Sequence, residues 1–296
     1  MLILRTLLFV PGNQERRIEK ARSVAADALI LDLEDSVPPA EKDSAREMVA
    51  ASIEGLASSE RKVFVRTNSL STPYAVPDIK AVVCGGLTGV VLPKSESAED
   101  VHKADTLVAD AEKETGMERG STQILALVET PMGVINAYEI ASASSRILGI
   151  ALGAEDYTLE MGITRTKEGG EIYYPRMVIS LACHAAGVLA VDSVYTDVRD
   201  TEGLIKETRV TKQMGFQGKQ VIHPDQVEPV NKAFVPSEEE ITHAQRVVEV
   251  YETAVSEGKA STSLDGRMVD APVAERARKL LALAESITKK ESANPM

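Results

Sequence analysis

The sequence predicts an α/β protein folded as a (β/α)8 TIM barrel with a C-terminal helical appendage. Three observations favour this fold class. Short apolar runs alternate with longer amphipathic stretches, which is the pattern of repeated βαβ units around a parallel sheet. Eight such runs occur, and eight repeats favour closure of the sheet into a barrel. The chain has 296 residues, enough for a barrel that takes roughly 250 residues.

The eight runs are short and almost continuously apolar, as expected of strands that are buried on both faces. They are Thr6–Val10, Ala28–Leu33, Lys62–Arg66, Gly89–Leu92, Gln123–Val128, Ile147–Leu152, Ala190–Val194 and Lys219–Ile222. The predicted helices between and after them include Gln14–Ala25, Ala40–Ile53, Ala98–Thr115, Gly133–Ala141, Pro175–Ala186, Thr201–Met214 and Asp225–Ala233. An open doubly wound sheet is the alternative, but no GxGxxG turn follows an early run.

The segment after the eighth repeat predicts the appendage. Ser237 and Glu240 form a capping box that opens a helix. Residues 258–266 are rich in Gly, Ser and Thr, which predicts a flexible linker. A last helix is expected over Asp270–Lys290, followed by a disordered end. The expected domains are a barrel over residues 1–257 and a linker with a C-terminal helical segment over residues 258–296.

The composition excludes several classes of partner. A net charge of −12 argues against nucleic acid or an anionic membrane as a bulk partner, but a local basic cleft still suits a small anion. No apolar run approaches the ~20 residues that span a bilayer. Cys84 and Cys183 lie in apolar stretches without CxxC spacing. They are typical of buried free thiols, which predicts a reducing, cytoplasmic location.

Polar and charged residues follow most of the predicted strands. The carboxyl ends of the strands in a β/α barrel meet at one face, where the active site lies. One such residue alone is more often a helix cap or an ion pair than a catalyst, but several at one mouth favour an active site. In strand order they are Asn13, Glu34 with Asp35, Arg66, Lys94, Glu129, Asp156, Tyr195 with Asp197, and His223.

Glu129 and Asp156 are the best candidates for metal ligands. They follow neighbouring predicted strands and have no Cys or His beside them. Hard oxygen ligands suit Mg²⁺, which uses one or two carboxylates and leaves its other positions to water and substrate. The structural alternative is that Asp156 caps a helix and that Glu129 pairs with Arg66. Gly153 and Ala154 are small, which favours close approach of backbone N–H groups to a substrate carboxylate.

The ordered blocks at the strand ends resemble the citrate lyase β-subunit-like family of the HpcH/HpaI aldolase superfamily, in particular its malyl-CoA and citramalyl-CoA lyase branch. The blocks are Leu8–Asn13, Asp32–Val37, Val65–Asn68, Leu92–Lys94, Val128–Pro131, Gly153–Asp156 and Gly218–Pro224. The resemblance implies a (β/α)8 barrel that uses Mg²⁺ and forms a homotrimer or a dimer of trimers. It makes Glu129 and Asp156 the metal ligands and Arg66 the residue that binds the substrate and stabilises an enolate.

The resemblance also suggests roles for other residues near the metal. Glu34 and Asp35 match an acidic pair, which we interpret as groups that orient Lys94 or a metal-bound water during catalysis. The candidates for contacts with the substrate or CoA are Phe9, Lys20, Lys94, Gly153, Ala154, Ile222, His223 and Pro224. From residue type alone, Phe9 equally suits the core, and His223 suits a hydrogen-bonded turn.

The appendage carries one more candidate. Gly266–Pro272 resembles the C-terminal segment of the CoA-lyase branch, in which the residue that matches Asp270 enters the active site of a neighbouring subunit. Asp270 is therefore expected to act as an acid or base in trans, although an Asp before Pro272 also suits a plain helix N-cap. Some family members lack this segment. Its presence favours a stand-alone CoA lyase over the citrate lyase complex that uses an acyl carrier protein.

The resemblance implies a lyase that cleaves a 3-hydroxyacyl-CoA reversibly. Citramalyl-CoA would give acetyl-CoA and pyruvate, and malyl-CoA would give acetyl-CoA and glyoxylate. Thioesterase activity would use the same residues. The alternatives are a citrate lyase β subunit that acts on a citryl thioester, a CoA-independent metal aldolase for 2-oxo acids, and a non-catalytic CoA-binding barrel. The side chain at the hydroxyl carbon of the substrate does not follow from the sequence.

Overall fold

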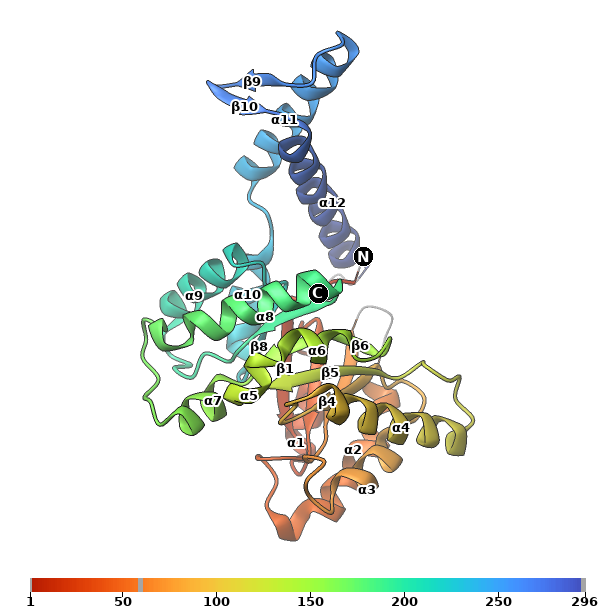
Figure 1. The fold of residues 1–296 in the computed structure, drawn as a ribbon. Helices are drawn as coiled ribbons and strands as arrows, with labels where there is room; N and C mark the ends of the chain where they lie inside the picture. The colour runs from red at the N-terminus through yellow and green to blue at the C-terminus, as the bar shows by residue number, and fades with distance from the viewer. Residues whose placement is uncertain (1, 58–60, 294–296) are drawn as a thin grey trace. The chain divides into compact units, whose positions relative to one another are not determined.

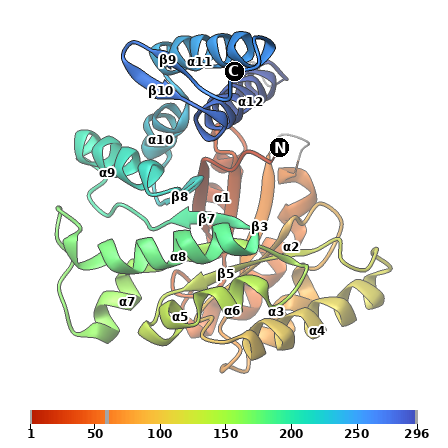
Figure 2. The ribbon, with the colours of Figure 1, turned by 45° about the horizontal axis from the view of Figure 1, so that its top comes forward.

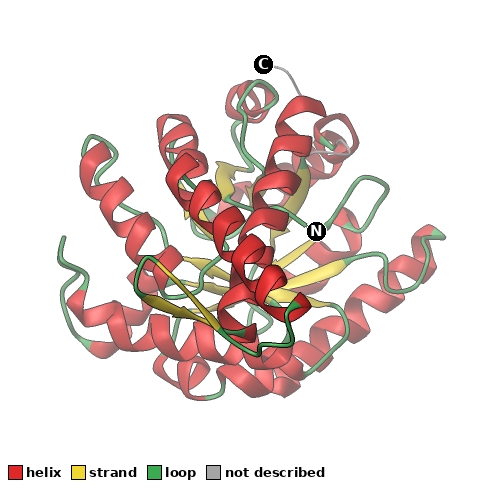
Figure 3. Cartoon of the chain, turned by 90° about the horizontal axis from the view of Figure 1, so that it is seen from above, coloured by secondary structure: helices red, strands yellow, loops and turns green. Residues whose placement is uncertain are grey.

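The chain folds into two compact units. The barrel unit is Leu4–Asn231, and the C-terminal unit combines Met1–Ile3 with Lys232–Met296. The computed structural model describes residues 2–57 and 61–293. In the barrel unit, eight parallel strands close in sequence order into one barrel, and helices surround it (Figures 1 and 3). The predicted fold class is confirmed.

The strands follow the predicted apolar runs within one or two residues. They are β1 (Thr6–Pro11), β2 (Ala28–Asp32), β3 (Lys62–Arg66), β4 (Gly89–Leu92), β5 (Gln123–Val128), β6 (Ile147–Leu152), β7 (Leu189–Asp192) and β8 (Gly218–Val221). The helices up to β8 and just after it are α1 (Glu15–Ala21), α2 (Lys42–Leu56), α3 (Ala75–Val82), α4 (Ala98–Thr115), α5 (Pro131–Ile135), α6 (Ala137–Ser142), α7 (Ala154–Met161), α8 (Tyr173–Ala186), α9 (Thr201–Gln213) and α10 (Val227–Phe234). The helices named from the sequence do not include α3 and α7, which have 8 residues each.

Alternate side chains of the strands fill the inside of the barrel. The interior cluster includes Leu7, Ile30, Phe64 and Leu127, which are all buried. Because side chains alternate along a strand, the residues two positions further along also face inward, and these lie at the carboxyl ends. They are Phe9, Asp32, Arg66 and Glu129. A layer that contains three charged side chains therefore lies next to the apolar interior, at the carboxyl ends of the strands.

A buried ion-pair network ties the amino-terminal end of the barrel to α4. Arg146 precedes β6, and its Nη1 and Nη2 donate to the two carboxylate oxygens of Glu112 at 2.8 and 2.7 Å. Its Nε donates to Asp105 at 2.6 Å. Burial alone would raise the pKa of Glu112, but Arg146 and two main-chain donors lower it to about 2. Glu112 is therefore a buried carboxylate whose ionised form is stabilised by Arg146.

We expect Arg146→Met to lower the free energy of unfolding by about 3–5 kcal/mol, because Glu112 would stay buried without its cation. Denaturant titration followed by circular dichroism measures the change. Lys103→Met is the matched control, since Lys103 forms an exposed pair with Glu99 in the same helix and should cost less than about 1 kcal/mol. An equal loss in both variants would contradict the role given to Arg146.

The C-terminal unit combines two helices with a small hairpin. Helix α11 (Glu238–Ser256) packs on α12 (Ala271–Ala293), while β9 (Thr262–Leu264) pairs antiparallel with β10 (Arg267–Val269). The buried core of this unit contains Ala244, Val247, Val269 and Ala277. In the part of the chain that the structure describes, no helix has the length and hydropathy needed to cross a membrane.

Parts of this region differ from the sequence expectation. The segment predicted as a flexible linker contains the hairpin, whose turn residues Asp265 and Gly266 have φ values of 51° and 78°. Asp-Gly favours such a turn, so this dipeptide is the signal that was overlooked. The compact unit begins at Lys232 rather than after residue 257, because α11 packs on α12. Helix α12 continues to Ala293, and the rest of the predicted disordered end lies outside the described residues.

Candidate active site

The guanidinium group of Arg66 is held in one orientation at the carboxyl end of β3. Its Nε and Nη2 donate to the two carboxylate oxygens of Asp32, each at 2.7 Å. Its Nη1 lies 3.1 Å from Glu34 Oε2 and 3.2 Å from Asp35 Oδ2. The centroid of the Phe9 ring lies 5.0 Å from Cζ. Arg66 is therefore a fixed cation with an aromatic ring on its face and carboxylates along its edges.

Asp32 is a site residue that sequence reasoning missed. It ends β2, is 2% exposed and accepts hydrogen bonds from the main-chain N–H groups of Glu34 and Ser36. Burial alone would raise the pKa of Asp32, but Arg66 holds it below its ordinary value, so Asp32 is an anion. The overlooked signal was a carboxylate at the end of an otherwise apolar strand.

The acidic pair Glu34 and Asp35 has Arg66 as a partner, which the sequence interpretation did not name. The sequence interpretation was that the pair orients Lys94 or a metal-bound water, and in the structure both carboxylates lie against Arg66. The side chain of Lys94 is exposed. The difference arises because β2 and β3 are neighbours in register, with Asp32 opposite Arg66, so the turn after β2 lies beside Arg66.

Glu129 follows β5 and is 2% exposed. Its Oε1 accepts a hydrogen bond from the main-chain N–H of Lys94 at 2.8 Å. Lys94 has a φ of 51°, which is uncommon for a residue other than glycine. On the other side, a Cβ added to Gly153 would lie 2.4 Å from Glu129 Cβ and 2.5 Å from its Oε2. Glycine at position 153 therefore leaves the space that Glu129 occupies.

Negative charge accumulates around Glu129. Burial, together with the charges of Glu34 and Asp156, raises the pKa of Glu129 to about 8. Burial also raises the pKa of Glu34 to about 7, although Arg66 opposes this shift. Asp156 lies half-buried in the first turn of α7. The site is thus rich in carboxylate oxygens that could bind a metal ion.

This arrangement fits a magnesium ion. A divalent cation between Glu129 and Asp156 would remove the repulsion between the carboxylates, and Mg²⁺ needs only one or two of them. Within residues 2–57 and 61–293, no group of three or more His, Cys, Asp or Glu is arranged to hold a metal. The remaining ligands would therefore be water and substrate, as is usual for Mg²⁺.

Comparison with known proteins identifies the family. A family model described as HpcH/HpaI aldolase/citrate lyase matches residues 5–224. The chain belongs to this family. It is 44% identical over 282 residues to the citrate lyase subunit beta of Leuconostoc mesenteroides subsp. cremoris, which covers 95% of this chain and 93% of the relative. It is 32% identical over 296 residues to the mitochondrial citramalyl-CoA lyase of Rattus norvegicus, with coverages of 97% and 87%.

Solved structures agree with this assignment. The protein CitE of Mycobacterium tuberculosis, in complex with magnesium, acetoacetate and coenzyme A, is 34% identical and has a TM-score of 0.79. The match covers 95% of this chain and 98% of that one. The predicted relationship to the citrate lyase β-like lyases is confirmed.

The C-terminal segment does not separate the branches of the citrate lyase family. We expected Gly266–Pro272 to favour a stand-alone CoA lyase over a citrate lyase subunit. The match with the Leuconostoc citrate lyase subunit covers 95% of this chain and therefore includes this segment. Citrate lyase relatives thus possess the same region, and its presence carries no preference.

Ile222, His223 and Pro224 form the turn after β8. His223 caps the short helix η3 (Pro224–Gln226), and its Nδ1 accepts a hydrogen bond from the main-chain N–H of Asp225 at 3.2 Å. The side chains of Ile222, His223 and Lys20 are exposed. Contacts among the described residues do not join these side chains to Arg66, so their roles in binding stay predictions. Ala154 begins α7 and is buried.

Asp270 lies in the C-terminal unit, where it caps α12. Its Oδ1 accepts a hydrogen bond from the main-chain N–H of Val273 at 3.2 Å, and its carbonyl accepts one from Ala274. The helix-cap alternative is therefore confirmed. A role for Asp270 in catalysis is compatible with the cap and stays a prediction.

Gln220 is a second buried polar residue that sequence reasoning missed. It lies on β8, is 2% exposed and donates from Nε2 to the carbonyls of Leu152 at 2.9 Å and Asp192 at 3.2 Å. These carbonyls lie at the ends of β6 and β7. Gln220 thus fixes the backbone that leads into Gly153.

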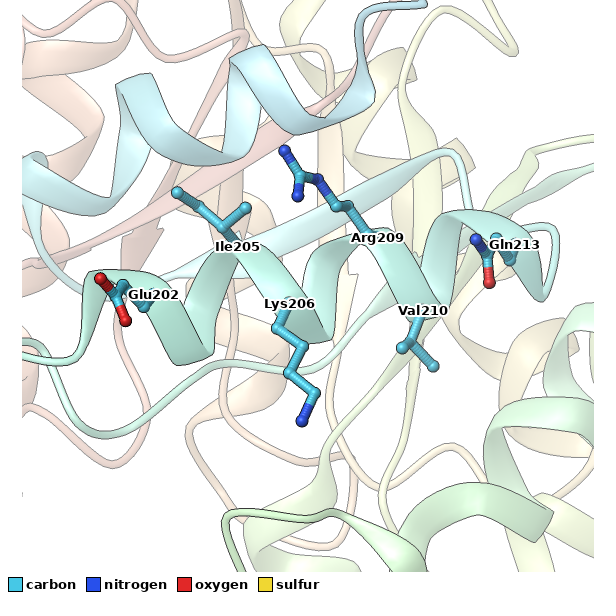
Figure 4. Close-up of a pocket in the computed structure, with 6 residues that line it drawn as sticks. All are labelled: Glu202, Ile205, Lys206, Arg209, Val210 and Gln213. Carbon is cyan, nitrogen blue, oxygen red and sulfur yellow. The ribbon is translucent and has the colours of Figure 1, made fainter.

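Helix α9 contributes to the fold rather than to the site. Its Glu207 joins a buried ion-pair network in which Asp192 accepts from Arg176 at 2.8 Å and from Lys219 at 2.6 Å. Another face of α9 borders a shallow hollow (Figure 4). That hollow is lined by Glu202, Ile205, Lys206, Arg209, Val210 and Gln213. None of these was a predicted site residue, so the hollow has no part in the proposed chemistry.

Proposed function

We propose that this protein is a Mg²⁺-dependent lyase that breaks a carbon–carbon bond in a 3-hydroxyacyl thioester whose hydroxyl carbon carries a carboxylate. The products are a 2-oxo acid and an acyl thioester. The observation that carries the proposal is a largely buried Arg66, held by three carboxylates, at the same barrel mouth as the carboxylates of Glu129 and Asp156. The magnesium and coenzyme A in the Mycobacterium tuberculosis relative support it.

A citryl thioester is the proposed substrate, with oxaloacetate as the 2-oxo acid. The sequence alone favoured citramalyl-CoA or malyl-CoA. The support for citryl is the identity of 44% with a citrate lyase subunit beta, against 32% with a citramalyl-CoA lyase. Citramalyl-CoA and malyl-CoA differ from citryl-CoA only in the group on the hydroxyl carbon, so they are the second candidates.

The residues of the site suit each step of this cleavage. Glu129 and Asp156 would hold Mg²⁺, which acts as a Lewis acid and lowers the pKa of the substrate hydroxyl. Glu34, with a carboxyl pKa of about 7, is suited to accept the hydroxyl proton. The carbon–carbon bond then breaks, its electron pair moves to the thioester carbonyl, and Arg66 stabilises the enolate oxygen. Asp270 in its protonated form would give its proton to the enolate carbon, and exchange with solvent would then return a proton to Asp270 and remove one from Glu34.

The substrate assignment is tested by incubating the protein with Mg²⁺ and each of citryl-CoA, citramalyl-CoA and malyl-CoA. Oxaloacetate, pyruvate and glyoxylate are measured separately, together with free CoA as a measure of thioester hydrolysis. We expect the highest kcat/KM with citryl-CoA. A higher kcat/KM with another of these thioesters would make that thioester the proposed substrate. Cleavage of free hydroxy-oxo acids without CoA would favour a CoA-independent metal aldolase. No turnover with any compound would contradict the proposal.

The expected homo-oligomer is supported by an exposed apolar surface on the barrel unit. Helices α5, α6, α7 and α8 lie on one side of the barrel (Figure 2). A monomer rarely exposes a contiguous apolar patch larger than a few hundred Å². The exposed side chains are Met132, Ile135, Tyr138, Leu159, Met161, Ile163, Tyr173, Tyr174, Met177 and Leu181. We propose that a second copy of the chain covers this surface, and light scattering after size exclusion should give a trimer or its multiple.

Asp270→Asn separates the cap from catalysis. Asn is as good an N-cap as Asp but cannot transfer the proton, so we expect an unchanged melting temperature and a kcat lowered about 10²–10⁴-fold. Asp270→Ala should lose about 1 kcal/mol of stability in addition. A wild-type kcat in Asp270→Asn would leave Asp270 as a cap alone. Partial recovery on mixing Asp270→Asn with Arg66→Lys subunits would support action in trans.

A further inference from the structure

The turn after β2 carries the two carboxylates that face Arg66, and buried donors anchor its backbone. The main-chain N–H of Leu33 donates to Arg66 O at 2.9 Å. The carbonyl of Leu33 accepts hydrogen bonds from Lys42 Nζ at 2.6 Å and from Asn68 Nδ2 at 3.0 Å. Lys42 Nζ also donates to the carbonyl of Glu34 at 2.8 Å. One ammonium group thus binds two consecutive carbonyls of this turn.

Lys42 is buried in a negatively charged environment. It is 7% exposed, and burying an ammonium group is costly unless other groups compensate. The Tyr74 ring centroid lies 5.9 Å from Nζ. The charged groups that face the ammonium are Asp32, Glu34 and Asp35 around the turn and Asp78 from α3. The charge of Lys42 therefore balances the excess of carboxylates around Arg66.

The second anchor, Asn68, is itself held in place. Its main-chain N–H and its Nδ2 both donate to Asp78 Oδ2, at 2.9 and 2.6 Å. Asp78 is fully buried and accepts from Arg46 Nε at 2.8 Å. These bonds connect the turns after β2 and β3 to α2 and α3. Because the surrounding turns are anchored, loss of the Lys42 hydrogen bonds should change the position of the turn after β2.

We propose that Lys42 is a positioning residue of the active site, whose ammonium group fixes the turn Leu33–Ser36 so that Glu34 and Asp35 hold the guanidinium of Arg66 in its catalytic orientation. Lys42 acts through main-chain carbonyls and through Arg66, without touching the substrate. The functional part of this proposal rests on the proposed lyase activity. The structural part, which is the anchoring of the turn, stands independently of it.

Lys42→Met tests the functional part, because it keeps the length of the side chain and removes its charge and donors. A misplacement of about 1 Å costs about 10²-fold in rate, so we expect kcat to fall about 10²-fold with little change in KM. Lys42→Arg keeps a cation with several donors and should restore most of the lost kcat. Lys80→Met is the matched control, since Lys80 forms an exposed pair with Glu114, and it should keep the wild-type kcat.

Amide hydrogen exchange tests the anchoring without requiring turnover. In Lys42→Met, peptides that cover residues 33–37 should exchange faster, whereas peptides over β6 should not change. Wild-type kcat or unchanged exchange at residues 33–37 would overturn the proposal. If the wild-type protein cleaves no thioester, the proposed function fails, while faster exchange still supports the anchoring. Should Lys42→Met not fold, Lys42→Gln keeps one donor and should show the same effects at smaller size.

Discussion

Arg66→Lys should lower both kcat and kcat/KM for the thioester substrate about 10²–10³-fold, which is the usual effect of removing one donor that stabilises an oxyanion. Lysine keeps the charge but cannot reproduce the two parallel hydrogen bonds to Asp32, nor the contact with the Phe9 ring. Its ammonium group would therefore not be held where the enolate oxygen forms. Steady-state kinetics with citryl-CoA measure the change.

The control for Arg66→Lys is Arg246→Lys. Arg246 forms an exposed pair with Asp265 in the C-terminal unit, so the same chemical change should leave kcat at the wild-type value. A rise of KM alone in Arg66→Lys would mean that Arg66 binds the substrate and its transition state equally well. That result would remove Arg66 from enolate stabilisation while keeping it in the site.

Gly153→Ala should abolish most of the activity and weaken the response to Mg²⁺. The added methyl group would lie within 2.5 Å of Glu129 Oε2, so the carboxylate must leave its position. Glu129 would then lose either its hydrogen bond to the Lys94 N–H or its alignment with Asp156. We expect the Mg²⁺ concentration for half-maximal activity to rise at least about tenfold, as when groups that orient metal ligands are changed.

Gly85→Ala is the matched control for this substitution. A Cβ at Gly85 meets no atom within 4 Å, and its φ does not require glycine. Both variants thus add one methyl group, but only the methyl group of Gly153→Ala meets the side chain of Glu129. An unchanged Mg²⁺ dependence in Gly153→Ala would show that Glu129 is not a metal ligand in the position found.

Most of the barrel could be predicted because buried parallel strands leave a strong local signal. Each run from Lys62–Arg66 to Ile147–Leu152 has the predicted bounds. Both ends of helix α4 were also predicted correctly. Ser97 and Asp100 form a capping box at its start, and Gly116 ends it in the left-handed region. The hairpin of the C-terminal unit carried only a dipeptide signal, and α11 shows nothing in its own sequence about which unit it joins.

The candidate site was predicted less completely, because its members are related by strand register rather than by sequence spacing. Glu129 and Arg66 follow strand ends and were found for that reason. Asp32 was hidden because it lies inside the predicted strand Ala28–Leu33, and Lys42 because it lies inside the predicted helix Ala40–Ile53. Pairing of β2 with β3 brings these charges together, and no periodicity in the chain encodes that pairing.

The left-handed backbone of Lys94 determines which substitutions this position tolerates. The N–H group that Glu129 receives belongs to the main chain, and every amino acid except proline supplies one. Replacing the exposed side chain by alanine would therefore test the predicted contact of Lys94 with the substrate or CoA, but not this main-chain hydrogen bond. Asn or Gly, which enter the left-handed region readily, should preserve the hydrogen bond from the main-chain N–H to Glu129. Valine or isoleucine should weaken it. At this position the hydrogen bond to Glu129 depends on a backbone torsion angle and not on a side-chain atom.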